Sequence, residues 1–377
     1  MDDVALRELV PQVLSVLVGR GAPFATAEDA VQEALIRMLT VAPENPKAWL
    51  ITTAWRVFLD MTRAESSRRD RETRFNDEPS ADDVVNADDT LRLYFLCAHP
   101  DLTPSSAVAL TLRAVGGLTT AQIAQAYLVP EATMAQRITR AKRTIAEAGV
   151  DQPGDVRTVM RTLYLVFNEG YSGDVDLAAE AIRLARQLLS LSDEPEIAGL
   201  LALMLLHHAR RASRTTSDGN LVPLAEQDRA RWDGDLIAEG VAVLQAALAR
   251  DRLGEYQAQA SIAALHADAR YVEETDWIQI LEWYDELLRF ADTAIVRLNR
   301  AVALGEAVGA AEGLAALETI APDVPRRDAV AAYLHERNGE LAVAASLYAV
   351  AARKASSVAE RDHLTRQAAR LHQSRRR

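Results

Sequence analysis

Several residue types and patterns are scarce in this chain of 377 residues, and each shortage excludes a class of protein. Cys97 is the single cysteine, which excludes a disulfide framework and a zinc or iron–sulfur site built from cysteines. Apolar runs such as residues 199–206 fall far short of the roughly 20 residues that a membrane-spanning helix needs. The N-terminal segment MDDVALRELV lacks the basic-then-apolar pattern of a secretion signal. These absences predict a soluble protein of the reducing cytoplasm with no membrane partner.

Catalytic and cofactor-binding motifs are absent as well. The sequence contains no GxxxxGK[ST] phosphate loop, no GxGxxG after a strand-like segment and no HExxH. His207 and His208 are adjacent, and neighbouring side chains on a helix point about 100° apart, so the two do not share a metal simply. Ser, His and Asp residues occur, but no motif brings them together. We therefore expect no enzyme activity, no catalytic residue, no cofactor and no metal site.

The chain is rich, by contrast, in sequence that forms helices. Hydrophobic residues make up 49% and charged residues 25% of the chain, which are values of a folded globular protein. Apolar residues recur at spacings of three and four, Ala and Leu dominate, and alternating strand-like runs are scarce. Thr26, Thr103 and the pair Thr119 and Thr120 precede helical segments as candidate N-caps. The sequence therefore predicts an all-α fold.

The charge of the chain is distributed unevenly. The chain carries 42 Lys and Arg against 54 Asp and Glu, a net charge of −12, which taken alone argues against a nucleic-acid partner. Six arginines nevertheless lie between residues 56 and 74, and four cations with no acid lie between residues 137 and 143. Between them, residues 77–89 carry six acids and no base. This pattern predicts a solvated linker between two basic modules; the alternative is that both clusters are ordinary solvated helix faces.

A short helix over residues 121–127, a turn at residues 128–130 and a second helix from Glu131 have the layout of a helix-turn-helix unit. The cations of this unit fall on the second helix and not on the first. In such a unit the second helix lies in the DNA major groove. Four of its polar side chains could then reach base edges or phosphates: Thr133, Gln136, Arg137 and Arg140.

Three stretches of the sequence form a recognisable series: residues 27–34 (AEDAVQEA), residues 45–54 (NPKAWLITTA) and residues 117–137 (GLTTAQIA, then VPEATMAQR). In this order they resemble the helix that binds core polymerase, the promoter-melting segment and the reader of the upstream promoter element in bacterial sigma factors of the sigma-70 family. Because no large vegetative insertion is visible, the resemblance is to the compact extracytoplasmic-function group.

The resemblance implies a set of site residues for each segment. The polymerase-binding residues would be Asp29, Gln32, Glu33 and Arg37. The residues that open and hold the downstream promoter element would be Trp49, Trp55, Arg56, Asp60, Arg63, Arg68 and Arg69. The residues that read the upstream element would be Thr133, Gln136, Arg137, Arg140, Lys142 and Arg143. Arginines that hold a strand backbone and flat side chains that stack on unpaired bases suit this task.

One position departs from the family pattern. Family members often have Arg-Asn after the alanine at position 54, where this chain has Trp55 and Arg56. The indole of Trp55 could stack on an unpaired base, or it could belong to the core of the module. Both interpretations stay open on the sequence alone.

From about residue 154 the sequence predicts helical hairpins, and stacked hairpins of this kind form a continuous core and a concave binding surface. Four motifs resemble the sigma-factor subgroup with a long TPR-like extension: YLVFNEGY (residues 164–171), QDRARW (227–232), TDW (275–277) and LNRAVA (298–303). Residues 214–235 interrupt the array. They are either a loop that contacts the sigma modules or a partner, or a packed connector.

The resemblance implies four parts: sigma region 2 at residues 1–75, an acidic linker at 76–90, a helix-turn-helix sigma region 4 at 91–150 and the TPR-like helical extension at 151–377. The expected partners are the RNA polymerase core and promoter DNA, with a small DGPF-type protein as an associated partner in this subgroup. The expected function is promoter-specific initiation of transcription, regulated by or dependent on the extension. The alternative is a TPR-like protein-binding adaptor with a degenerate helical N-terminal domain.

Overall fold

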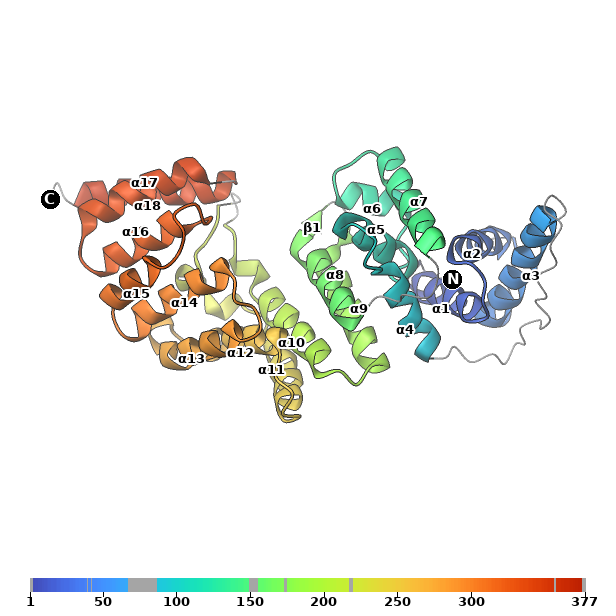
Figure 1. Cartoon of the computed structure of the whole chain (residues 1–377), viewed down its shortest axis with the longest axis horizontal. Coiled ribbons are helices and arrows are strands. Elements are labelled where there is room, and N and C mark those ends of the chain that lie inside the picture. Colours follow the sequence, from blue (N-terminus) through green and yellow to red (C-terminus); the bar gives the residue numbers. More distant parts are fainter. Residues whose placement is uncertain are drawn as a thin grey trace. The chain divides into compact units, whose positions relative to one another are not determined.

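The predicted all-α class is confirmed by the computed structural model (Figure 1). The structure describes residues 3–38, 40–41, 43–66, 87–148, 155–172, 175–216, 220–355 and 357–374. Within these ranges the extended structure is limited to a two-residue antiparallel pairing of β1 (Tyr171–Ser172) with β2 (Val175–Asp176) and an isolated bridge between Thr215 and Leu221. All other regular elements are helices.

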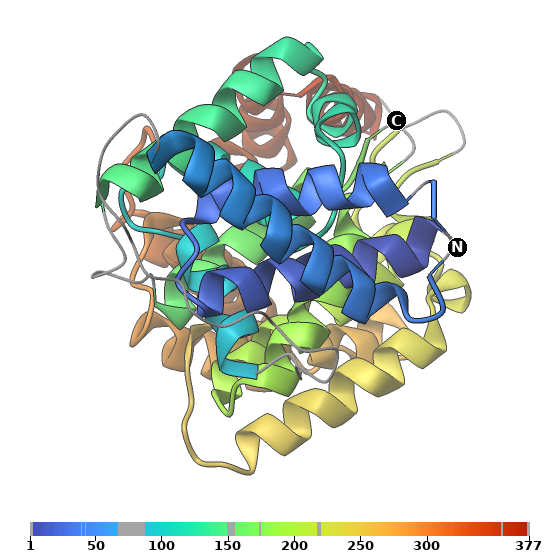
Figure 2. The same cartoon turned by 90° about the vertical axis from the view of Figure 1, so that its right-hand side faces the viewer.

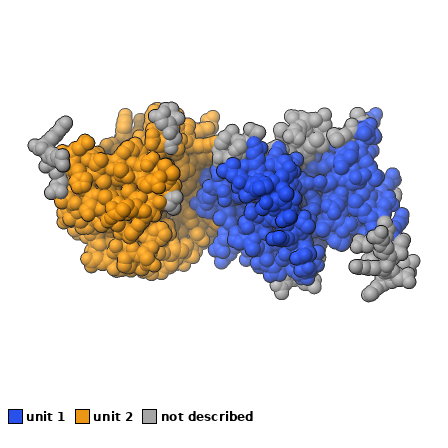
Figure 3. Space-filling model, turned by 90° about the horizontal axis from the view of Figure 1, so that it is seen from above, with its two compact units in different colours: residues 1–193 blue, residues 194–377 orange. Residues whose placement is uncertain are grey.

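The chain divides into two compact units, residues 1–193 (unit 1) and residues 194–377 (unit 2), which are coloured separately in Figure 3. The helices of unit 1 are α1 (Asp3–Gly19), α2 (Phe24–Met38), α3 (Pro46–Ser66), α4 (Ala87–Cys97), α5 (Pro104–Ala114), α6 (Thr120–Ala126), α7 (Glu131–Ala148), α8 (Val156–Glu169) and α9 (Leu177–Leu191). Figure 2 views the molecule from the side of α1, α2 and α3, whose blue ribbons lie in front.

Helix starts follow the predicted caps at two of three positions. Thr103 accepts a hydrogen bond from Ser106 N and is followed by Pro104 in the first turn of α5, where a missing N–H costs nothing. Thr119 caps α6. The prediction for Thr26 is wrong, because α2 begins one turn earlier, where Ala27 N donates to the carbonyl of Pro23 at 2.9 Å.

The core of unit 1 extends from the first helices into α8 and α9. Tyr94 of α4 is fully buried, and its hydroxyl donates to the carbonyl of Leu184 on α9 at 3.0 Å. Burial raises the pKa of the Tyr94 hydroxyl, so it stays a neutral donor. Cys97 is buried in the same helix, and burial likewise raises the pKa of its thiol. Since α8 and α9 pack on α4 and α5, unit 1 continues past residue 150 to Asp193.

Unit 2 is an array of helices with short 3-10 turns (η) between some of them. Its elements are α10 (Pro195–Ala209), η1 (Arg211–Ser213), η2 (Leu224–Glu226), η3 (Arg229–Arg231), α11 (Gly234–Leu248), α12 (Glu255–Asp268), η4 (Val272–Glu274), α13 (Trp277–Leu288), α14 (Ala294–Ala307), α15 (Ala310–Leu317), α16 (Arg327–Arg337), α17 (Leu341–Lys354) and α18 (Val358–Ser374). Helices that are neighbours in sequence pack on one another, and successive apolar clusters are centred on Ile280, Leu334 and Tyr348. The predicted helical array is confirmed.

Part of the predicted organisation lies outside the described residues. This holds for Arg68 and Arg69 and for the predicted linker as far as residue 86. The last four residues of that predicted linker, 87–90, form the first turn of α4. The division of the chain at residues 75, 90 and 150 stays a prediction.

Candidate nucleic-acid interface

The helix-turn-helix layout predicted from the sequence is present as α6 and α7. A capping box starts α6: Thr119 Oγ1 accepts from Gln122 N at 3.1 Å, and Gln122 Oε1 accepts from Thr119 N at 2.9 Å. The turn contains Leu128, which has a left-handed φ of 51° and is 86% exposed. The buried face of α7, including Met134 and Ile138, packs against α5 and α6. The opposite face of α7 is left to solvent.

Four of the residues predicted to read DNA line one groove beside α7. The groove has a volume of about 420 Å³, and its wall on α7 consists of Thr133, Gln136, Arg137 and Arg140 together with Ala141 and Thr144. The facing wall is the start of α5, where Thr103, Ser105 and Ser106 lie, with Asp101 before it. A helix N-terminus attracts phosphate oxygens through its unpaired N–H groups and its dipole.

The charges along α7 fall into two groups. Arg137 and Arg140 line the groove, whereas the ion pairs of α7 in the described part of the chain involve Lys142 and Arg143. Arg143 pairs with Glu147 at 3.4 Å on the exposed surface. Lys142 points away from the groove and is only 17% exposed. Geometry therefore groups five of the six predicted reader residues on the solvent side and separates Lys142 from them.

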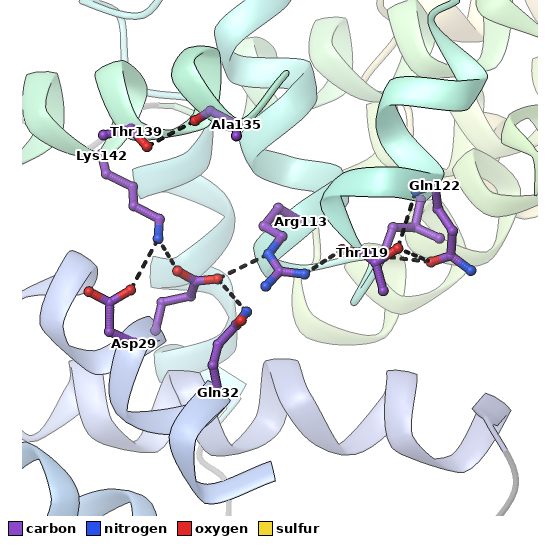
Figure 4. Close-up of polar contacts among 10 residues, drawn as sticks. Asp29, Gln32, Arg113, Thr119, Gln122, Ala135, Thr139 and Lys142 are labelled. Carbon is purple, nitrogen blue, oxygen red and sulfur yellow. Dashed lines mark hydrogen bonds and ion pairs between the residues drawn. The ribbon is translucent and has the colours of Figure 1, made fainter. Parts of the chain in front are cut away.

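Lys142 is held by a buried carboxylate on α2, Glu28, whose side chain is 6% exposed. Figure 4 labels the residues around this carboxylate: Asp29, Gln32, Arg113 and Lys142. Glu28 Oε2 pairs with the Lys142 ammonium, and Glu28 Oε1 accepts from Arg113 Nε at 3.0 Å and from Gln32 Nε2 at 2.8 Å. Lys142 also lies 3.6 Å from Asp29 Oδ1. We call Glu28, Asp29, Arg113 and Lys142 the Glu28 cluster. It joins α2 to α5 and α7 within unit 1.

The Glu28 cluster was not predicted as a unit. The sequence predicts that Asp29 binds polymerase and that Lys142 binds DNA. It predicts no site role for Glu28 or Arg113. Arg113 is fixed from the other side as well, because its Nη1 donates to the carbonyl of Leu118 at 3.0 Å. The buried Glu28 carboxylate thus pairs with two cations that are mostly shielded from water, and Asp29 supplies a second negative charge beside Lys142.

The remaining polymerase-binding candidates lie on the outer face of α2. Glu33 and Arg37 form an exposed ion pair in which Arg37 Nε lies 3.0 Å from Glu33 Oε1. Ile36, one residue away, is 61% exposed. Gln32 points toward Glu28 instead. The outer face of α2 therefore offers two charges and an apolar side chain to a partner.

The candidates on α3 separate into core and surface. Trp55 is 2% exposed, and its ring lies 5.2 Å from that of Phe58, so the structure places it in the core of the module. Trp49 is half-buried, and Arg56 is exposed. Asp60 and Arg63 are exposed and lie one turn apart, with Arg63 Nη1 4.0 Å from Asp60 Oδ1.

Comparison with known proteins supports the interpretation of these modules. Residues 5–68 match the family model for sigma-70 region 2, and residues 92–145 match the model for sigma-70, region 4. The chain belongs to the sigma-70 family. Residues 155–248 of this sigma-70 chain match a family of unknown function (DUF6596). Helices α2 and α3 thus lie in region 2, and α5, α6 and α7 lie in region 4, so the Glu28 cluster connects the two regions.

Relatives of the sigma-70 chain include an uncharacterized protein, R00370, of Rhizobium meliloti, 41% identical over 351 residues that cover 84% of this chain and 82% of that protein. A probable ECF RNA polymerase sigma factor, SigI, of Mycobacterium tuberculosis is 31% identical over 178 residues, 40% of this chain and 61% of that protein. No solved structure matches. In the part of the chain that the structure describes, no helix is both long and apolar enough to cross a membrane. The family supports a sigma-factor role, with RNA polymerase core and promoter DNA as the implied partners.

Proposed function

We propose that this chain directs the RNA polymerase core to specific promoters and that its extension controls this step. The observation that carries the proposal is the groove beside α7, where Thr133, Gln136, Arg137 and Arg140 face the N-terminus of α5. Two unneutralised guanidiniums, two neutral polar groups and a helix N-terminus suit a DNA strand, with the arginines and the helix end on phosphates and Thr133 and Gln136 on base edges. The match to sigma-70 regions 2 and 4 supports the same assignment.

Each remaining surface has a proposed task. The outer face of α2, with Glu33 and Arg37, binds polymerase, and Asp29 and Gln32 contribute at its edge. The exposed residues of α3, Arg56, Asp60 and Arg63, contact the downstream promoter element. Trp49 is the aromatic side chain better placed for stacking, because Trp55 would have to leave the core. Arg68 and Arg69 keep their predicted role, and the cytoplasm remains the expected location.

The Glu28 cluster bears on when these surfaces can act. While Lys142 pairs with Glu28 and Asp29, its ammonium does not reach DNA, and Asp29 is shared between two regions. We propose that regions 2 and 4 are held together through this cluster in the free chain and separate when polymerase and promoter DNA bind. An acidic chain of net charge −12 would then bind free DNA weakly and depend on polymerase for placement.

Replacing Arg137 and Arg140 together with alanine is expected to abolish most promoter-specific transcription. Each phosphate contact contributes about 0.9 to the slope of log K against log[salt], so the double variant should show a slope smaller by about 2. The measurement is promoter binding and transcript yield with purified core polymerase at several salt concentrations, on genomic fragments selected by the complex.

The matched control is Arg289→Ala, which removes an exposed arginine that pairs with Glu286 at 2.7 Å in unit 2. It should change neither the slope nor the transcripts. An unchanged slope in the double variant would show that the groove does not hold phosphate. If the native chain fails to associate with core polymerase even at low salt, the adaptor interpretation replaces the sigma-factor one.

The regulatory role of the extension predicts that a chain ending at Asp193 stays folded but transcribes at a rate severalfold different from that of the full chain. The cut leaves unit 1 whole, including the Tyr94–Leu184 hydrogen bond between α4 and α9. The comparison is transcript yield from both chains at equal polymerase occupancy, with circular dichroism as the test of folding. Equal yields would show that the extension does not control initiation.

A cut at residue 150 is a different experiment, because it removes α8 and α9 and uncovers Tyr94. Loss of transcription in that chain would report damage to unit 1 and not loss of regulation. The small DGPF-type partner of the extension remains a prediction, which affinity capture on the immobilised full chain would test.

A further inference from the structure

The segment that joins α10 to α11 contains a group of polar side chains that promoter recognition does not use. It spans residues 210–233, carries the QDRARW motif and lies entirely inside the stretch that matches the family of unknown function. Four of its side chains form what we call the arginine–tryptophan cluster: Arg210, Ser213, Arg229 and Trp232.

Two guanidinium groups of the arginine–tryptophan cluster share one indole. The Arg229 guanidinium carbon lies 4.7 Å from the centre of the Trp232 ring, and that of Arg210 lies 5.8 Å from the same ring. Arg229 Nη1 is fixed by the carbonyls of His266 and Ala269, at 2.5 and 2.6 Å. Ser213 is the last residue of η1, and η1 packs on η3, which ends one residue before Trp232. The position of the Arg229 guanidinium is therefore set by the backbone at the end of α12.

The two positive charges are not directly paired with a carboxylate of the described residues. In the described part of the chain, no acidic side chain forms an ion pair with Arg210 or Arg229. Burial lowers the pKa of Arg229 in spite of the opposing charges of Glu273 and Glu274. Burial, together with the positive charges of Arg214 and Arg229, lowers the pKa of Arg210 to about 10. Two like charges are thus kept close together in partly desolvated surroundings, which is unfavourable without a counter-charge.

The pKa values of the two neighbouring histidines, His207 and His266, are lowered by burial and by the same positive charges. Burial first, and then the charge of Arg210, lowers the pKa of His207 to about 3 and that of His266 to about 4. Both rings are therefore neutral at pH 7, and neither adds charge to the cluster. The charges that act on the cluster are therefore those of Arg210, Arg229 and the nearby Arg214, opposed by the carboxylates of Glu273 and Glu274.

Three hydrogen-bonding atoms of the cluster are shielded from solvent and unpaired: Ser213 Oγ, Arg229 Nη2 and Trp232 Nε1. Ser213 is 4% and Trp232 is 8% exposed. Native proteins pair nearly all buried polar groups, and each unpaired one costs about 1 to 3 kcal/mol. The guanidinium and the indole are donors only, and a hydroxyl can also donate. A negatively charged oxygen acceptor matches both the donors and the charge.

We propose that the arginine–tryptophan cluster binds the oxyanion group of a small ligand, a carboxylate or a phosphate. Arg210 and Arg229 supply the charge, and the Trp232 indole N–H and the Ser213 hydroxyl fix the orientation. Arg210 is only partly buried, so the ligand enters from its side. This site is separate from the proposed promoter recognition, because the chain would bind the anion in the absence of polymerase and DNA.

The test is isothermal titration calorimetry of the full-length chain with sodium phosphate and, separately, with sodium acetate, at constant ionic strength set with sodium chloride. We expect saturable binding of at least one anion at one site per chain. Saturation by phosphate alone identifies a phosphate-bearing ligand, and saturation by acetate alone identifies a carboxylate-bearing one. If neither anion binds saturably, the proposal is wrong.

Two variants assign the binding to this cluster. Arg210→Gln should weaken the affinity at least tenfold, and Trp232→Phe, which keeps an aromatic ring but loses the N–H donor, should weaken it severalfold. The matched control is Arg231→Gln, which removes an exposed charge two residues from Arg229 and should leave the affinity within twofold. Thermal melting of each variant verifies that it is folded. If all three substitutions lower the anion affinity equally, the anion is attracted by the overall positive charge of this region and does not bind at the cluster.

Discussion

Glu28→Gln is expected to lower the free energy of unfolding of unit 1 by about 3 kcal/mol, because removing one partner of a buried ion pair leaves the other uncompensated. Here Arg113 and Lys142, which are only 15% and 17% exposed, lose the buried carboxylate, and Lys142 keeps only Asp29 at 3.6 Å. The measurement is urea unfolding of the chain ending at Asp193, followed by circular dichroism, so that unit 2 does not contribute to the transition.

The control for this prediction is Glu33→Gln on the same helix. Glu33 is 41% exposed and pairs with Arg37 one turn away, so its loss should cost about 0.5 kcal/mol or less. Equal losses in both variants would mean that the Glu28 cluster is no more than a surface contact.

The proposed role of the Glu28 cluster also predicts a change in DNA binding. If the cluster holds regions 2 and 4 together, Glu28→Gln should raise the affinity of the free chain for promoter DNA while it lowers stability. Combining it with Lys142→Met measures the coupling between the two residues, which should exceed about 1 kcal/mol for groups in direct contact. A coupling near zero would argue that Lys142 gains little from Glu28.

Gly199→Ala is expected to destabilise unit 2 by about 2 kcal/mol, because it inserts a methyl group where two helices are in backbone contact. A Cβ at position 199 would lie 2.6 Å from Gln257 N and 3.0 Å from Gln257 Cα, so α10 and α12 would have to move apart. Gln257 is itself fully buried, which leaves it no space to yield. Thermal melting of the full chain monitors the transition of unit 2.

Gly234→Ala is the matched control, since a Cβ there meets no atom within 4 Å at the start of α11. It should leave the melting temperature unchanged or raise it slightly, because alanine has less conformational freedom in the unfolded chain. A Gly199→Ala variant that melts like this control would show that α10 and α12 tolerate a wider separation.

The sequence was sufficient to predict features that depend on neighbours along the chain. The N-cap at Thr119 and the start of α7 at Glu131 follow from local preferences, and so the helix-turn-helix layout was predictable, whereas the reciprocal bond of Gln122 was not predicted. The placement of α2 was predicted too, but its first turn was not, because Thr26 resembles an N-cap and the helix begins before it.

Features that depend on residues distant in sequence were not predicted. Glu28 lies next to the apolar stripe of α2, so the periodicity of the sequence predicts that this side of the helix is buried. It does not predict that Arg113 and Lys142, which follow 85 and 114 residues later, pair with Glu28. The same holds for α8 and α9: their patterns predict helices, but their packing on α4 and α5 rests on contacts such as that of Tyr94 with Leu184. The arginine–tryptophan cluster was visible only as a motif, because its unpaired donors are a property of three-dimensional packing.

The burial of Cys97 makes the native chain a convenient background for spectroscopy. A thiol reagent reacts with the thiolate, and burial both blocks access and keeps this thiol protonated. A cysteine introduced on an exposed helix face would therefore be the site that takes a fluorophore or spin label, with no prior replacement of the natural residue. Paired labels on α2 and α7 could then follow the separation of the two sigma regions directly as polymerase is added.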